Sequence, residues 1–448
     1  METLSGFIAF IFSFKAYVML PGIILVLGLI IRMKPGQAAL SALRLGVGFA
    51  GIFIVFDFFV KQIAPAVTSM IVTRGLDFPV LDVGWPPLAA ITWASPIAPL
   101  TIVLVLILNI AMLSLNITKT INIDIWNYWH FALVGALVQS ATGSIALGLI
   151  VTTLIAFYSI VVADWTAPRV HSECGLKGIS ITTLSVNGIL PYAVAADKLF
   201  DLVPGLRKIS LSPKGTAQRF GILMDPLVIG ASIGVLFGIL AAYDIKRVLE
   251  LAINIAAVMF ILPHCGGLIG RAMEPVSLQL KALIQKRFPD KKVLYIGMDS
   301  GILMQNSAVI VTGLILMPIS IAIAFVLPGN KVLPLGDLAN LISVMSVIVL
   351  VTRSNVFRAV IIGIPVVISF LLISTHFAPM YTRLSAQAGM VGTASYAGQI
   401  TAFADGGNPL RFWFFYLFQG NPLALVGVPV VLALMYFAWK RNKKELLE

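Results

Sequence analysis

Charged side chains are scarce in this sequence: Asp, Glu, Lys and Arg together make up 11% of its 448 residues. An ordinary soluble domain carries about 25%. Hydrophobic residues make up 59%, and so few polar side chains could not cover that much apolar surface in water. The shortage excludes a soluble enzyme, a disordered chain and a nucleic-acid-binding domain. It predicts a membrane protein, and at about 20 apolar residues per span the length allows roughly ten to twelve crossings.

Cysteine and the common cofactor motifs are also scarce or missing. The two cysteines, Cys174 and Cys265, are far apart and form no Cys-x-x-Cys pair, which argues against a zinc site and a disulfide framework. The sequence has no Walker loop, no G-x-G-x-x-G motif after a strand and no HExxH motif. We therefore expect no metal, no cofactor and no ATP hydrolysis by a P-loop.

Lys and Arg outnumber Asp and Glu by 31 to 19, which gives a formal net charge of +12. In a membrane protein such an excess is typical of cytoplasmic loops, so it indicates topology rather than a nucleic-acid partner. Cations at 440, 441, 443 and 444 predict a cytoplasmic C-terminus, and those at 32, 34 and 44 predict a periplasmic N-terminus. The first apolar run, 7–31, is too long for a signal peptide. We expect a multi-pass protein of a bacterial inner membrane.

The chain resembles itself after a shift of about 213 residues. Residues 80–84 match 293–297, and Asp124 matches Asp337. The segment 61–82 has few cations whereas its counterpart 271–292 has many, so the two halves are predicted to have opposite orientations. Inverted repeats are typical of transporters that alternate access around a site at the membrane midplane.

This similarity divides the chain into three parts. We expect a first inverted repeat over 1–200, with scaffold helices at about 7–75 and a core at about 80–200. A second repeat covers 201–420, with scaffold helices at about 220–285 and a core at about 293–420. Residues 421–448 add the last span and a basic cytoplasmic tail.

Polar groups at membrane depth are costly unless they are paired or face water, so they mark candidate sites. Asp82 and Trp85 lie where Gly84 and Pro86 interrupt regular helix. Tryptophan can stack on the C–H face of a polyol, and a carboxylate accepts hydroxyl hydrogen bonds. An aromatic belt at the membrane interface explains Trp85 equally well.

His130 precedes the apolar run 131–163, and Gln139 lies further along it. A ligand role for His130 and a structural role at the end of a span are equally compatible with the sequence. The run is longer than one crossing needs, and Gly143-Ser144 could break it.

Three further candidates are polar residues beside or between spans. The hydroxyls of Thr182 and Thr183 suit a neutral polyhydroxylated ligand, although they could instead bond to their own helix. Asp299 is the acidic residue that we favour most, because several polar side chains surround it in the sequence; a helix N-cap is the alternative. Asp405, in a Gly- and Asn-containing segment, is a weaker candidate.

These residues resemble the galactitol-specific membrane component (IIC) of the bacterial phosphotransferase system, which belongs with the ascorbate-type IIC proteins. The resemblance covers nearly the whole chain in order. It rests on residues 82–86, 92–95, 122–127, 129–130, 141–144, 220–221 before Pro226, 242–244, 328–330 and 332–339.

The resemblance implies an all-α polytopic membrane fold of two inverted repeats plus a C-terminal span, with an elevator-type scaffold and core in a homodimer. It implies that a cytoplasmic IIB protein, acting with IIA, phosphorylates the polyol from a phosphocysteine, so that this chain needs no phosphoryl carrier. His130 and Asp299 match substrate-binding positions of ascorbate-type proteins. A galactitol-type chain would show His where this one has Thr182-Thr183, which leaves the stereoisomer of the polyol open.

Two other classes of function are also compatible with the sequence. An ion-coupled secondary transporter of a small polyhydroxylated substrate would accumulate it unmodified and would depend on an ion gradient. A membrane-embedded transferase with an Asp/His pair would need both side chains within about 3 Å of a reacting atom.

Overall fold

The computed structural model describes residues 16–75, 77–207, 209, 225–287, 294–390 and 398–445. Seven helices in these ranges are long and apolar enough to cross a membrane: 35–70, 97–114, 145–174, 245–284, 307–326, 356–387 and 422–443. The chain is thus an all-α multi-span membrane protein, as its composition predicts. Seven candidate spans are fewer than the ten to twelve that length alone allows, because several apolar runs form shorter helices. The predicted start of the first span at residue 7 and the cations Lys291 and Lys292 lie outside the described residues.

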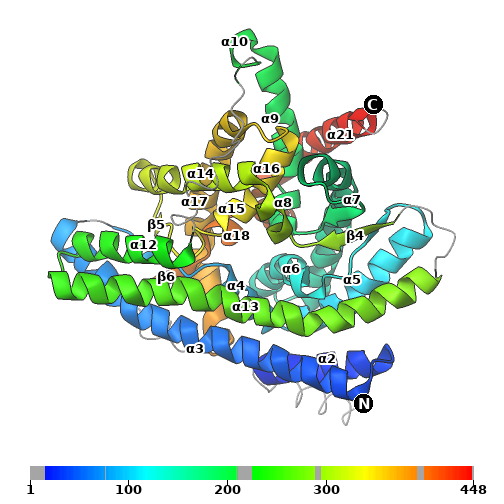
Figure 1. The fold of residues 1–448 in the computed structure, drawn as a ribbon, viewed down its shortest axis with the longest axis horizontal. Coiled ribbons are helices and arrows are strands. Elements are labelled where there is room, and N and C mark those ends of the chain that lie inside the picture. Colours follow the sequence, from blue (N-terminus) through cyan, green and yellow to red (C-terminus); the bar gives the residue numbers. More distant parts are fainter. Residues whose placement is uncertain are drawn as a thin grey trace.

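Two helix pairs form a layer along one side of the molecule (Figure 1). In the first pair, α2 (Ala16–Ile30) precedes the long α3 (Pro35–Arg74); in the second, α12 (Pro226–Leu240) precedes the long α13 (Ile245–Arg287). α3 packs along α13, so the two pairs form one continuous layer of helices.

Both pairs turn in the same way. The turn of the first pair has Arg32 in the left-handed region, with φ 64°, and the turn of the second has Ala242 there, with φ 55°. Within the second pair the helices approach closely, since a Cβ at Gly234 would lie 2.5 Å from the Cα of Ala252. Only glycine permits that distance, so the sequence of α12 sets the spacing of this layer.

The remaining helices gather on the other side of this layer (Figure 1). They are α4 (Trp85–Trp93), α5 (Ile97–Ser114), η1 (Ile125–Tyr128), α6 (Trp129–Thr142), α7 (Ile145–Cys174), α8 (Leu184–Asn187), α9 (Leu190–Leu202), α10 (Pro204–Arg207), η3 (Ser300–Gln305), α14 (Ser307–Val326), α15 (Leu341–Val344), α16 (Ser346–Val351), α17 (Val356–Gln387), α18 (Phe403–Gly406), α19 (Pro409–Leu417), α20 (Pro422–Val426) and α21 (Val428–Glu445).

The predicted break in the long apolar run is confirmed. α6 ends at Thr142, where Gly143 takes a left-handed conformation with φ 73°. Ser144 then caps α7, its hydroxyl accepting a hydrogen bond from the backbone N–H of Leu147. A left-handed glycine and a serine N-cap are the standard signals for a helix end and a helix start, which is why the sequence could locate this boundary.

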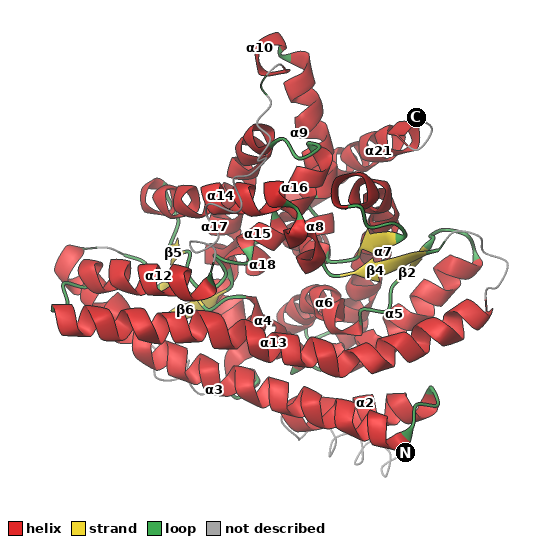
Figure 2. Ribbon diagram, viewed as in Figure 1, coloured by secondary structure: helices red, strands yellow, loops and turns green. Residues whose placement is uncertain are grey.

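Two small parallel sheets lie on opposite sides of the centre of the molecule (Figure 2). In one, β1 (Val80–Asp82) lies between β5 (Val332–Leu333) and β6 (Gln399–Thr401). In the other, β4 (Tyr295–Met298) lies between β2 (Thr120–Ile121) and β3 (Ile179–Ile181). Each middle strand comes from one half of the chain, and both of its neighbours come from the other half. The sheets therefore connect the two halves of the chain, and Trp85 after β1 and Asp299 after β4 line the same cavity.

A cluster of charges joins three helices at one end of the molecule. The carboxylate of Asp197 on α9 pairs with Arg358 at the start of α17, 2.9 Å away, and with Arg441 on α21, 3.1 Å away. Asp201, one turn further along α9, also pairs with Arg358 but is more exposed. These pairs hold the C-terminal helix against the rest of the molecule.

Candidate functional site

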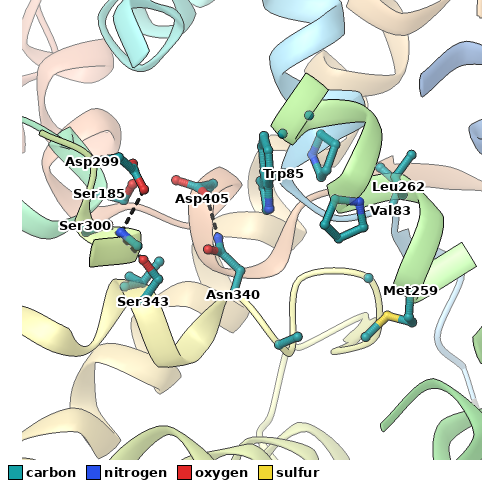
Figure 3. Close-up of a pocket in the computed structure, with 18 of the residues that line it drawn as sticks. Val83, Trp85, Ser185, Met259, Leu262, Asp299, Ser300, Asn340, Ser343 and Asp405 are labelled. Carbon is teal, nitrogen blue, oxygen red and sulfur yellow. Dashed lines mark hydrogen bonds between the residues drawn. The ribbon is translucent and has the colours of Figure 1, made fainter. Parts of the chain in front are cut away.

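A cavity of about 450 Å³ lies between the layer of paired helices and the remaining helices (Figure 3). Its volume is in the range of small-molecule sites in proteins. Its polar wall is built by Asp124, Asn127, His130, Thr183, Ser185, Asp299, Ser300, Asn340, Ser343 and Asp405. The opposite wall comes from the paired helices and is apolar, with Phe59, Ile63, Ile233, Ile255, Val258, Met259 and Leu262.

Trp85 connects the two walls. It begins α4 directly after β1 and Gly84, and its ring lines the cavity. A Cβ at Gly266 on α13 would lie 2.5 Å from the edge of this ring. The indole therefore packs directly against the backbone of α13, which is possible only because residue 266 is glycine. The ring thus presents its apolar surface to the cavity beside the carboxylates, an arrangement that suits a ligand with both C–H and O–H groups.

Asp299 is the centre of the first polar cluster. It follows β4 and caps η3, and its Oδ1 accepts a hydrogen bond from the backbone N–H of Gly301. Its Oδ2 accepts hydrogen bonds from Asn127 Nδ2 (2.8 Å) and from Thr183 Oγ1 (3.0 Å). The Asn127 amide also donates to Asp124 Oδ2 (2.7 Å), so one side chain bridges two carboxylates.

A second cluster has the same chemistry. The Asn340 amide donates to Asp337 Oδ1 (3.1 Å) and to Asp405 Oδ2 (2.8 Å), and Figure 3 shows the second of these bonds. Asp337 Oδ2 accepts the backbone N–H groups of Ala404 and Asp405, both at 3.0 Å. In both clusters an asparagine follows an aspartate after three residues and holds a second carboxylate at the cavity wall.

His130 lies at the start of α6, beside the second cluster. Its ring stacks on that of Trp129, with centroids 3.9 Å apart. Its Nδ1 is 2.6 Å from Nη2 of Arg411 and 3.6 Å from Oδ1 of Asp405. Arg411 has no exposed surface, and its guanidinium also donates to the backbone carbonyl of Asp405.

The structure places five of the eight candidate residues on the cavity wall: Asp299, His130, Thr183, Trp85 and Asp405. The other three lie behind it. Asp82 is fully buried, and its carboxylate accepts four backbone N–H groups, from Gly84, Leu335, Asp337 and Phe403. Thr182 is buried beside β3, and its backbone N–H bonds to β4. Gln139 lies about two and a half turns along α6 from His130 and is not among the residues that line the cavity.

The candidates chosen from the sequence do not include six other polar wall residues: Asp124, Asn127, Ser185, Ser300, Asn340 and Ser343. Ser300 and Ser343 share a hydrogen bond of 2.9 Å between their hydroxyls (Figure 3). A signal for Asn340 was present, because Asp124-x-x-Asn127 and Asp337-x-x-Asn340 have the same spacing and are related by the same shift along the chain.

The charges on the wall are of one sign. Asp124, Asp299 and Asp405 line the cavity, whereas none of the described lining residues is Lys or Arg. Nor do three His, Cys, Asp or Glu side chains converge as metal ligands in the ranges that the structure describes. Carboxylate acceptors with hydroxyl and amide neighbours can bind a neutral ligand rich in hydroxyl groups, and they disfavour an anion.

The chain is similar to known proteins over almost its full length. The model of the family EIIC-GAT, described as "PTS system sugar-specific permease component", matches residues 10–395. The "PTS system galactitol-specific EIIC component" of Escherichia coli (strain K12) is 34% identical over 428 residues, which cover 95% of this chain and 94% of that protein. The "Putative permease IIC component" of the same strain is 34% identical over 440 residues, covering 97% of this chain and 99% of that protein.

Proposed function

The chain belongs to the EIIC-GAT family of phosphotransferase-system permease components, and from this premise we propose that it binds and translocates galactitol or a closely related neutral polyol. As a IIC component of the galactitol type it works with IIB and IIA proteins of a bacterial phosphotransferase system. In the proposed cycle the polyol enters from the periplasm, and the cytoplasmic IIB protein phosphorylates it from its own phosphocysteine.

The carboxylate-lined cavity is the observation that carries this proposal. A polyol hydroxyl can donate to a carboxylate and accept from a nitrogen, so it can use Asp299 and His130 together. Ascorbate is an anion at neutral pH, and the three wall carboxylates disfavour it. The same repulsion acts on a phosphorylated product, which favours its release over its return.

We assign roles to the five wall residues accordingly. Asp299 accepts hydrogen bonds from hydroxyls, and Thr183, bound to the same carboxylate, orients the ligand. His130 contacts a further hydroxyl, with Asp405 beside it. Trp85 packs on the carbon backbone. Asp82, Thr182 and Gln139 act indirectly, by shaping the loops and the helix behind the wall.

We further propose that the two helix pairs are the scaffold of an elevator-type homodimer and that the other helices form its mobile core. The matching turns of the pairs and the exchange of strands between the halves support two inverted repeats, 1–200 and 201–420, followed by a last span. The proposed boundary at 201 precedes residues 210–224, which lie outside the described ranges. In this arrangement the N-terminus is periplasmic and the C-terminus cytoplasmic.

Binding to the purified protein tests the substrate. We expect selective binding of galactitol, with mannitol and sorbitol competing more weakly and ascorbate not at all. Proteoliposomes then test the mode of transport, which should require IIB and deliver polyol phosphate. Accumulation of unmodified polyol that collapses with a proton or sodium gradient would instead establish an ion-coupled permease.

A further inference from the structure

Arg411 is a buried cation that the proposed binding site does not use directly. It is the third residue of α19, and Asn408 caps the start of that helix, accepting the backbone N–H groups of Leu410 and Arg411. The cap and the helix fix the backbone of Arg411, and its guanidinium lies over the ring of Trp129, 5.6 Å from the centroid. The side chain is therefore held behind the cavity wall, with His130 between it and the cavity.

The contact between Arg411 and His130 has only one chemical interpretation. A guanidinium has five N–H donors and no acceptor, and it stays protonated in proteins. At 2.6 Å from Nη2, the Nδ1 atom of His130 must therefore accept the hydrogen bond with its lone pair. The proton of a neutral imidazole then lies on Nε2, because one ring nitrogen accepts and the other donates.

We propose that Arg411 is a positioning residue that fixes His130 as the neutral Nε2–H tautomer, so that His130 offers the polyol a hydrogen-bond donor. This inference rests on the proposed function for the identity of the ligand, but the tautomer itself does not depend on it. A site lined by carboxylates has abundant acceptors and needs donors. With Nε2–H facing the ligand, one hydroxyl oxygen accepts from His130 while its proton remains free for a carboxylate.

The groups around His130 favour a proton on its Nδ1 atom, and Arg411 opposes this. Asp405 Oδ1 lies 3.6 Å from Nδ1, Ser185 Oγ lies 3.5 Å from it, and Asp124 and Asp299 line the same cavity. Without the guanidinium, Asp405 is the strongest neighbouring acceptor and favours a proton on Nδ1. His130 would then become either the Nδ1–H tautomer, with a lone pair toward the ligand, or an imidazolium paired with Asp405.

Nitrogen NMR on the full-length protein labelled with ¹⁵N-histidine tests the inference directly. The chain has four histidines, so single substitutions of His171, His264 and His376 assign the signal of His130. We expect the wild type without ligand to show the neutral Nε2–H pattern at every pH from 5 to 8. An Nδ1–H pattern, or an imidazolium signal within that range, would overturn the proposal.

Two substitutions of similar size separate positioning from packing. Arg411→Lys keeps a donor that can reach Nδ1 and has no acceptor, and we expect it to retain the Nε2–H pattern. Arg411→Met removes the donor, and we expect His130 to titrate between pH 5 and 8 and galactitol affinity to become pH-dependent by about fivefold or more across that range. An unchanged His130 signal in folded Arg411→Met would refute the role of Arg411; if that variant does not fold, the wild-type spectrum still decides.

The outcome also separates this inference from the proposed function. An Nε2–H signal in a protein that binds no polyol would leave the role of Arg411 intact and reject the substrate. Polyol binding by a protein with the Nδ1–H tautomer would support the substrate and reject the role of Arg411.

Discussion

Replacing Asp299 with asparagine removes one charge from the cavity and changes almost no volume. Its carboxylate now accepts from Gly301, Asn127 and Thr183. An asparagine there can still cap η3 with its oxygen, but its NH₂ group then meets the NH₂ group of Asn127. The wall thereby loses a charged acceptor at the position assigned to a substrate hydroxyl.

The expected magnitude follows from the bond that is lost. A hydrogen bond to a charged group contributes about 1.5–3 kcal/mol, which corresponds to roughly 10- to 150-fold in Kd. We expect galactitol binding to Asp299→Asn, measured by isothermal titration calorimetry on the purified protein, to weaken within that range.

Asp225→Asn is the matched control. Asp225 is an exposed N-cap of α12 that does not line the cavity, and asparagine caps helices as well as aspartate does. Galactitol should bind to Asp225→Asn as tightly as it binds to the wild type. Binding by Asp299→Asn within about twofold of the wild type, at an unchanged Tm, would refute the assignment of Asp299.

Three other predictions concern specificity and stability. Thr183→His restores the imidazole that the family resemblance leads one to expect, and we expect the ratio of galactitol to mannitol affinity, measured by competition binding, to change by about tenfold. Asp82→Asn turns an amide N–H toward backbone N–H donors, so we expect the free energy of unfolding to fall by about 3 kcal/mol, measured as a lower Tm. The folded protein should bind polyol as the wild type does. Asp197→Asn breaks a buried ion pair and should lower the free energy of unfolding by about 3 kcal/mol. Asp201→Asn affects a more exposed pair and should lower it by under about 1 kcal/mol. Equal shifts in Tm for the two variants would contradict this account.

The sequence predicted the features that depend on neighbours along the chain. A glycine followed by a serine marked the break after Thr142 because both act on the backbone locally. Asp299 stands out in the sequence because a short polar stretch there precedes a span, and the structure places it on the cavity wall. The membrane class followed from composition alone, because the chain has too few charges to coat its apolar surface.

Features that depend on distant parts of the chain could not be predicted. The strands have two to four residues, too few for a periodic pattern, and β1 pairs with residues beyond 330. For the same reason the sequence does not reveal that backbone N–H groups from residues 335–403 bind the Asp82 carboxylate. Arg411 lies in an aromatic stretch, and only the fold brings it to His130.

The exchanged strands also have a consequence for how the chain is made. β1 is complete at residue 82, but its partner β6 ends at residue 401. At a synthesis rate of about 5–20 residues per second, its N–H and C=O groups wait roughly 15–60 s for that partner. Unpaired backbone in a lipid environment is costly, so during this interval the first half must remain shielded by the insertion machinery or by water. The two halves of the molecule thus become stable together, only after the second half has been synthesised.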